Sequence, residues 1–255
     1  MIIIGLGTGR SGTASLAKLL NAQSDAICFH EMNPSCMRWE GTPRPAVNMV
    51  EEFGAILDGG PTQRLTVDLS RPPAAEAYEQ LKKMPRARML GDIAFYYLTY
   101  VDDLLAASDR VRFICLKRDR TQTVTSWMTK SGLPRWPSKA IGERISAAIT
   151  REPYHDSRNF WMEHDGTKWA LDPVWDKLYP KFTGPTKREA VEQYWDFYYA
   201  EAEKIEARLP KVFRIVRTED LDDRDFQSEL LTFCGVSDSD KVHTDAHIHK
   251  SKLAS

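Results

Sequence analysis

A short glycine-rich stretch near the start of the chain carries the strongest chemical signal. Residues Gly7 to Thr13 read GTGRSGT, with a single cation, Arg10, inside the stretch. The residues that follow have the spacing of an amphipathic helix. The first N–H groups of a helix have no acceptor within the helix, and the helix dipole favours negative charge at that end. We therefore predict that a phosphate-like anion binds to residues Gly9 to Thr13.

Two kinds of nucleotide-binding loop can be compared with this stretch. The Walker A loop needs a lysine directly after its last glycine, whereas Gly12 is followed by Thr13 and Ala14. A simple ATP or GTP hydrolase is therefore disfavoured. The dinucleotide pattern G-x-G-x-x-G is met by Gly7 and Gly9 together with Gly12, and an acidic residue follows the next apolar run. A nicotinamide-dependent oxidoreductase thus stays open as an alternative.

Two carboxylates and a histidine lie at the ends of predicted strands. His30 and Glu31 follow the apolar run Ala26 to Phe29, and Asp92 lies near the end of the run Arg88 to Ile93. The carboxyl ends of parallel strands line the ligand crevice, so these side chains are placed for proton transfer. Alternatively, Glu31 caps the next segment or pairs with an arginine.

A second cluster of cations follows another apolar run. Phe113 to Leu116 predicts a buried strand, and Lys117, Arg118 and Arg120 come directly after it, before a helix expected from about Thr121. A serine follows eight residues after the second of these cations, which is about two helical turns further on. The cluster indicates either a second anion site or a solvated basic edge.

Taken together, these motifs resemble the PAPS-dependent sulfotransferases, whose donor is 3′-phosphoadenosine 5′-phosphosulfate (PAPS). The matching features are a basic residue followed by [ST]-G-T at Arg10, an arginine and a serine eight residues apart at Arg118 and Ser126, and a late strand and helix in FRIVRTEDLDDRDFQSELLTFCGV. The resemblance implies a loop that holds the phosphosulfate, an Arg-Ser pair that holds the 3′-phosphate, and a basic residue near the C-terminus that closes over it. The donor-binding residues implied are Gly9, Arg10, Ser11, Gly12, Thr13, Ala14, Ser15, Arg118, Ser126 and Lys250.

The resemblance also implies roles in catalysis. Arg10 would neutralise charge on the departing phosphate, although an arginine cannot protonate it as a lysine could. Glu31 is the first candidate for the base that activates the acceptor, His30 the second and Asp92 the third. The reaction needs no metal. The acceptor would be a small molecule, a carbohydrate or a lipid carrying a hydroxyl or amine. A non-catalytic protein that binds PAPS without turning it over is a further alternative.

These residues need a particular set of elements to position them. The apolar pattern predicts strands at 2–4, 26–29, 88–93, 113–116 and 212–216, and helices after the glycine loop and at 47–57, 74–84, 95–107, 187–209 and 226–233. We expect Thr13 or Ser11 to cap the first helix. The predicted fold class is α/β: one three-layer domain over residues 1–255, with a central parallel sheet flanked by helices. The resemblance relates this fold to the P-loop nucleotide kinases.

Composition limits the classes of partner and the cellular compartment that we expect for this protein. A chain of 255 residues with a net charge of −1 gives no general reason to expect nucleic acid as a partner. The four cysteines lack C-x-x-C spacing and are predicted to be free thiols in a reducing compartment, most simply the cytoplasm. No apolar run is long enough to span a membrane. Residues 131–187 are rich in aromatic residues and proline, which is typical of a substrate-binding lid or of a structural excursion. No sequence feature indicates the oligomeric state.

Overall fold

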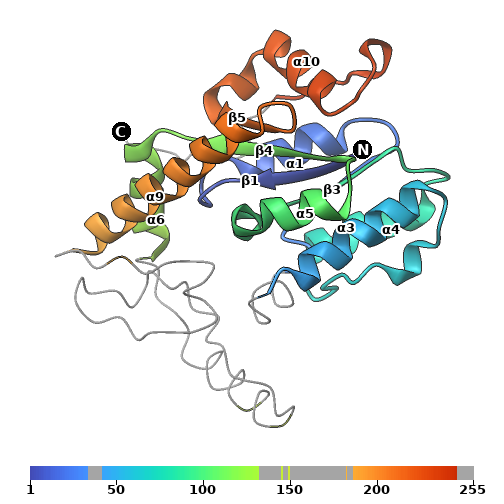
Figure 1. Cartoon of the computed structure of the whole chain (residues 1–255), viewed down its shortest axis with the longest axis horizontal. Helices are drawn as coiled ribbons and strands as arrows, with labels where there is room; N and C mark the ends of the chain where they lie inside the picture. The colour runs from blue at the N-terminus through green and yellow to red at the C-terminus, as the bar shows by residue number, and fades with distance from the viewer. Residues whose placement is uncertain (34–41, 132–144, 146–148, 150–181, 183–185, 246–255) are drawn as a thin grey trace.

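The computed structural model describes residues 1–33, 42–131, 145, 149, 182 and 186–245. The strands in this part of the chain form one parallel sheet in the order β2-β3-β1-β4-β5 (Figure 1). They are β1 (Ile2–Leu6), β2 (Ala26–His30), β3 (Met89–Ile93), β4 (Val111–Lys117) and β5 (Phe213–Arg217). The α-helices are α1 (Thr13–Asn21), α3 (Arg44–Leu57), α4 (Pro72–Lys83), α5 (Val101–Ala107), α6 (Arg120–Ser131), α9 (Lys187–Arg208) and α10 (Arg224–Phe233).

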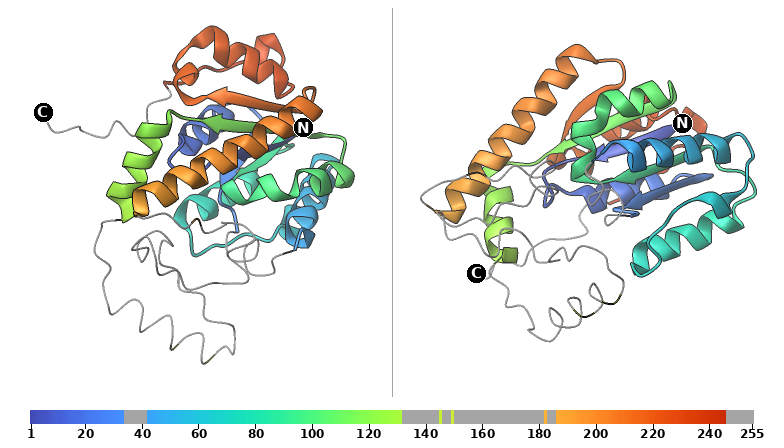
Figure 2. Two further views of the ribbon diagram at one scale, coloured as in Figure 1. Left: turned by 60° about the vertical axis from the view of Figure 1, so that its left-hand side comes forward. Right: turned by 60° about the horizontal axis from the view of Figure 1, so that its bottom comes forward.

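Both faces of the sheet are covered by helices, because its strands are apolar on both sides. In β1, Ile2 and Ile4 pack into a core shared with α3, α4, α5, α6 and α9, whereas Ile3 packs on the opposite face with α1 and α10. All three isoleucines are 0% exposed. Figures 1 and 2 show the two helical layers on either side of the sheet. The predicted three-layer α/β fold is confirmed.

The strand order places the glycine loop at the carboxyl end of the central strand, β1. β1 lies between β3 and β4, with Gly5 opposite Ile93 and Leu6 opposite Cys115. Because all the strands are parallel, the segments that follow β1, β2, β3 and β4 emerge at the same edge. The three stretches that the sequence singled out therefore meet in space.

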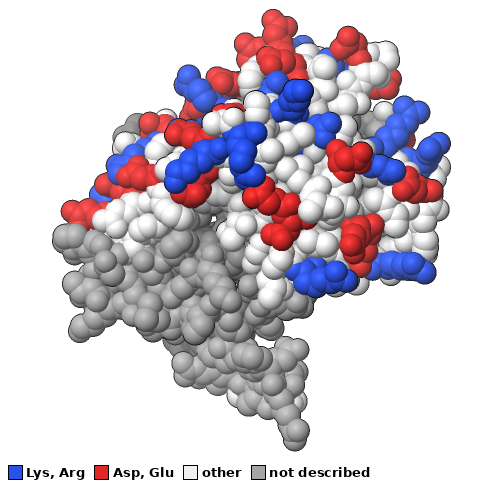
Figure 3. Space-filling model, viewed as in Figure 1, with Lys and Arg blue, Asp and Glu red and all other residues white. Residues whose placement is uncertain are grey.

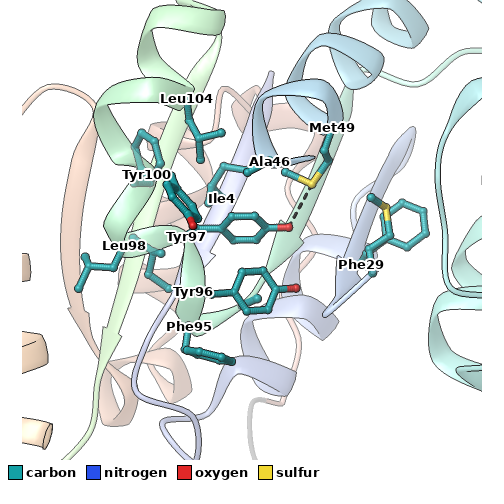
Figure 4. Packing of buried hydrophobic residues seen from close by; sticks show 14 of the residues in the cluster. Ile4, Phe29, Ala46, Met49, Phe95, Tyr96, Tyr97, Leu98, Tyr100 and Leu104 are labelled. Carbon is teal, nitrogen blue, oxygen red and sulfur yellow. Dashed lines mark hydrogen bonds between the residues drawn. The ribbon is translucent and has the colours of Figure 1, made fainter. Parts of the chain in front are cut away.

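The aromatic segment after β3 differs from the prediction. Instead of one helix over 95–107, a 3-10 helix, η2 (Phe95–Tyr100), is followed by the shorter α5. Successive rings pack on each other, Phe95 against Tyr96 and Tyr96 against Tyr97, with centroids 4.9 and 4.8 Å apart. Five of the six residues of η2 are buried, namely Phe95, Tyr96, Tyr97, Leu98 and Tyr100. Figure 4 shows the rings gathered beneath α3, where the Tyr97 hydroxyl meets Met49 Sδ.

The helix ends follow local chemistry, with one correction. A capping box of Thr186 and Glu189 starts α9, and the Asp223 side chain caps α10. At the far end of α10, Gly235 has φ 83°. The first helix, however, is not capped by the Thr13 or Ser11 side chain: its N-cap is Gly12, in the left-handed conformation.

Two further 3-10 helices, η1 (Thr62–Arg64) and η5 (Asp238–Asp240), lie in connections, and η4 (Thr218–Asp222) follows β5. The cysteines at 28, 115 and 234 are buried free thiols, and burial raises their pKa. No helix in the described ranges is long and apolar enough to cross a membrane. Figure 3 shows basic and acidic side chains interspersed over one face. Cys36, Lys250 and nearly all of the region 131–187 lie outside the described residues.

Candidate functional site

The glycine loop between β1 and α1 is built from residues in the left-handed region. Gly9, Arg10 and Gly12 have φ of 72°, 60° and 87°. Among the described residues, the backbone N–H groups from Arg10 to Ala14 have no hydrogen-bond acceptor, whereas Ser15 N–H already donates to Gly12 O at 2.8 Å. A run of unpaired amides at a helix N-terminus is the local requirement for binding an anion.

The two inner glycines are required by close packing as well as by backbone conformation. A Cβ on Gly9 would lie 2.9 Å from the Trp127 ring, and a Cβ on Gly12 would lie 2.5 Å from the Thr218 methyl group. The Thr218 hydroxyl also donates to Ser11 O at 2.6 Å. Elements α6 and η4 therefore hold the loop from two sides.

The two predicted anion-binding motifs meet directly. Arg10 Nε donates to Ser126 Oγ at 2.9 Å, and Arg118 donates to Arg10 O at 3.2 Å. The Arg118 guanidinium is further held by two bonds to Gln122 Oε1. The arginine and the serine, two turns apart around the start of α6, thus both reach the glycine loop.

Two guanidinium groups lie near each other beside the glycine loop, and the hydrogen bonds that hold them go to uncharged acceptors, Ser126 Oγ, Arg10 O and Gln122 Oε1. Burial lowers the pKa of Arg10, and the positive charge of Arg118 lowers it further. Like charges held this close are stabilised by an anion bound between or beside them. The electrostatics of this edge therefore favour a phosphate or sulfate group.

On the other side of the loop, His30 contacts the helix start. Its Nε2 lies 2.9 Å from Thr13 Oγ1, within hydrogen-bond distance. Thr13 is the first residue of α1, so this contact ties the end of β2 to the N-terminus of α1. A histidine at this point can orient the threonine hydroxyl or exchange a proton with it.

Glu31 is paired with an arginine, which was one of the two alternatives left open by the sequence. Its Oε2 lies 2.9 Å from Arg71 Nη2, and both side chains are about one-third exposed, at 32% and 34%. Glu31 has φ 54°, and its N–H donates to Ile93 O. The ion pair holds the carboxylate in place and leaves part of it open to solvent.

Asp92 lies below this turn and is 0% exposed. Its carboxylate accepts hydrogen bonds from Met32 N–H, at 3.1 and 3.2 Å to its two oxygens, and from the Tyr97 hydroxyl, at 2.6 Å. Burial raises the pKa of Asp92 to about 6, and the two hydrogen bonds act in the opposite direction. A carboxylate enclosed in this way can fix the backbone that carries Glu31, but no bulk solvent reaches it.

Several contributors could not be recognised in the sequence. Arg71 lies in a stretch without a motif, and Thr218 lies within the late strand and helix of the family resemblance but has no role there. Tyr198 is predicted from the sequence only as part of the apolar face of the helix at 187–209. Tyr198 accepts a hydrogen bond from Gly7 N–H at 3.0 Å.

The predicted site residues can now be placed. Arg10, Thr13, His30, Arg118 and Ser126 are brought together around the loop. The Ser11 side chain is buried against Gly7, so only its backbone N–H is left as a donor for an anion at the loop. Within the described ranges, no three His, Cys, Asp or Glu side chains form a group that could hold a metal ion.

The model of a family described as "Sulfotransferase family" matches residues 2–170. Among solved structures, the chain is similar to the crystal structure of a sulfotransferase from Alicyclobacillus acidocaldarius, with 13% identity and a TM-score of 0.47 over 98% of this chain and 86% of that one. No curated protein matches the sequence.

Proposed function

The chain belongs to the sulfotransferase family, and from this premise we propose that it transfers a sulfuryl group from PAPS to a hydroxyl or amine. The observation that carries the proposal is the meeting of Arg10, Ser126 and Arg118 at a loop of unpaired amides. The donor has phosphate groups at two positions of its ribose, and the two motifs provide two groups of anion-binding residues. A nicotinamide cofactor would leave Arg118 and Ser126 without a role.

The hydrogen-bonding groups around the loop suit the two phosphate groups of PAPS. Backbone N–H groups from Arg10 to Ala14 and the Arg10 guanidinium would hold the 5′-phosphosulfate. Arg118 and Ser126 would hold the 3′-phosphate, because a guanidinium and a hydroxyl are ordinary phosphate ligands. We keep Lys250 in this subsite because the family resemblance implies a basic residue near the C-terminus there; Lys250 itself lies outside the described residues.

Charge neutralisation is the main task of the loop. When PAPS is bound it supplies the sulfuryl group, and negative charge develops on the phosphate oxygen that the group leaves. Arg10 and the loop amides are fixed donors for that charge, and preorganised donors of this kind contribute a large share of catalysis. Arg10 stays protonated, so a leaving-group proton would have to come from elsewhere.

Glu31 remains our first choice for the base that activates the acceptor. It follows β2, it is partly exposed, and Arg71 holds its carboxylate in one orientation. His30 is second, because its ring is already bonded to Thr13. Asp92 is buried beneath both, so we assign it the task of positioning the turn at Glu31 and Met32.

The acceptor class and the cellular compartment are proposed on general chemical grounds. Small molecules, carbohydrates and lipids with a hydroxyl or amine are all within reach of the chemistry. The three buried free thiols support a reducing compartment, and we propose the cytoplasm.

The test is calorimetry on the wild-type protein with 3′-phosphoadenosine 5′-phosphate (PAP), adenosine 5′-monophosphate (AMP) and NAD. We expect PAP to bind at least about tenfold more tightly than AMP, because only PAP engages both subsites. Preference for NAD, or no discrimination by the 3′-phosphate, would overturn the proposal. Transfer from PAPS carrying a sulfur radiolabel to a panel of hydroxyl and amine compounds then separates an enzyme from a protein that only binds the donor.

A further inference from the structure

Helix α9 contacts the glycine loop and the end of β4 through consecutive tyrosines. Tyr198 and Tyr199 are 5% and 1% exposed, and they project from one side of the helix into the space behind the loop. Their rings pack together, with centroids 5.5 Å apart. A helix far along the chain thus supports two segments that the proposed function assigns to two different phosphates.

Tyr198 supports the glycine loop. Its oxygen accepts the Gly7 N–H at 3.0 Å, and its hydroxyl donates to Phe95 O at 2.9 Å. One turn earlier on the same helix, the Tyr194 hydroxyl lies 3.4 Å from Thr8 O. The backbone entering the loop is therefore tied both to α9 and to the segment after β3.

Tyr199 reaches the second segment. Its hydroxyl donates to Leu116 O at 2.7 Å, two residues before Arg118, and lies 3.4 Å from the Thr8 hydroxyl. The next residue of β4, Lys117, has its ammonium group 5.5 Å from the centroid of the Tyr199 ring. Tyr199 consequently touches both the start of the loop and the end of the strand that leads to Arg118.

Both hydroxyls are permanent donors. A tyrosine hydroxyl is protonated near neutral pH even in water, and burial raises the pKa of Tyr198 and of Tyr199 further. The carbonyl groups of Phe95 and Leu116 that accept these hydrogen bonds belong to buried residues, and a buried carbonyl that loses its donor is destabilised. The contacts are therefore strong enough to hold the two segments in one arrangement.

We infer that Tyr198 and Tyr199 are positioning residues that fix the distance between the 5′-phosphosulfate subsite and the 3′-phosphate subsite. This inference rests on the proposed function, because it presupposes a ligand with phosphates at both positions. Such a ligand gains affinity from binding two groups at once only while the spacing of the subsites matches its own. A ligand with one phosphate gains nothing from that spacing.

The experiment compares PAP, AMP and adenosine 3′-monophosphate by calorimetry, on wild type and on Tyr199→Phe. The substitution removes one hydroxyl and keeps the ring. We expect the affinity for PAP to fall about tenfold and the affinity for either monophosphate to fall less than about twofold. Tyr78→Phe is the matched control. Tyr78 lies on α4, away from the loop, and its hydroxyl also donates to a backbone carbonyl, Thr62 O.

Equal losses for all three ligands would mean a general structural role and would overturn the inference, as would an unchanged affinity for PAP. Urea unfolding tests whether the Tyr199→Phe protein is folded. If it is not, Tyr198→Phe is used in its place, and we again expect a larger loss of affinity for PAP than for either monophosphate. Failure of the wild type to prefer PAP over AMP would instead overturn the proposed function.

Discussion

Arg10 Nε and Ser126 Oγ lie 2.9 Å apart although 116 residues separate them in the chain. One belongs to the loop after β1 and the other to the helix after β4, on neighbouring strands of the sheet. The bond joins two motifs that would bind different phosphates of one donor. Several consequences for binding, catalysis and stability can be measured.

Arg118→Ala should weaken PAP binding and leave AMP binding nearly unchanged. The guanidinium would contribute charge-assisted hydrogen bonds to the 3′-phosphate, and bonds of this kind contribute about 1.5–3 kcal/mol, or roughly 10- to 150-fold in affinity. Arg110→Ala is the control, because Arg110 pairs with Asp58 just before β4, away from the loop. Titration calorimetry provides both constants, and an equal loss for PAP and AMP would contradict the assignment.

Glu31→Gln should lower turnover by about a hundredfold or more, because it removes a base but keeps the size of the side chain. The Kd for PAP should stay within about twofold, since no phosphate contact is lost. The measurement is label transfer from PAPS to whichever acceptor the radiolabel screen identifies. Glu229→Gln, which breaks a surface pair with Arg214 on the opposite layer, should leave the rate unchanged. A fully active Glu31→Gln protein would remove Glu31 from the role of base.

Asp92 should make the free energy of unfolding depend on pH. Burial raises its pKa from 3.8 to about 6, so the folded protein holds this proton more tightly than the unfolded chain does. Its contribution to stability is therefore full below about pH 4 and is lost as the pH rises through 6. The total change is on the order of 3 kcal/mol.

Urea unfolding of wild type and Asp92→Asn across this range provides the check. The stability of wild type relative to the variant should decline from about pH 4 to about pH 7. Asparagine can accept from Met32 N–H and donate to the Tyr97 oxygen, so the local contacts are conserved. A relative stability that is flat or rises with pH would show that the buried carboxylate is not responsible.

Gly12→Ala should damage both stability and binding. A Cβ at this position meets the Thr218 methyl group at 2.5 Å, and φ of 87° is strained for alanine, which together should lower the free energy of unfolding by about 1–3 kcal/mol. PAP affinity should fall as the loop shifts. Gly54→Ala is the matched control, because Gly54 lies inside α3 with nothing within 4 Å of its added Cβ and should gain about 0.5–1 kcal/mol. Thermal unfolding of the two variants should therefore shift in opposite directions.

The local elements and the main motifs could be predicted because each depends on a short stretch of chain. The run Ile2 to Ile4, the glycine loop, and the cations after β4 all have signatures within about a dozen residues. The prediction of one α-helix over 95–107 was wrong for Phe95 to Tyr100, which form a 3-10 helix. The rings of this segment pack on each other and against α3, and the spacing of apolar residues does not encode that packing.

The α/β class, the glycine loop between the first strand and helix, and the family resemblance could all be predicted from the sequence, since apolar periodicity and glycine spacing act locally on the backbone. Only the tertiary structure decided the strand order, the pairing of Glu31 with Arg71 40 residues away, the burial of Asp92, and the contacts of Tyr198 and Tyr199 with the loop. These depend on which surfaces exclude water together. Which surfaces are buried against each other depends on the packing of the whole core, so these contacts cannot be predicted from a short stretch of the chain.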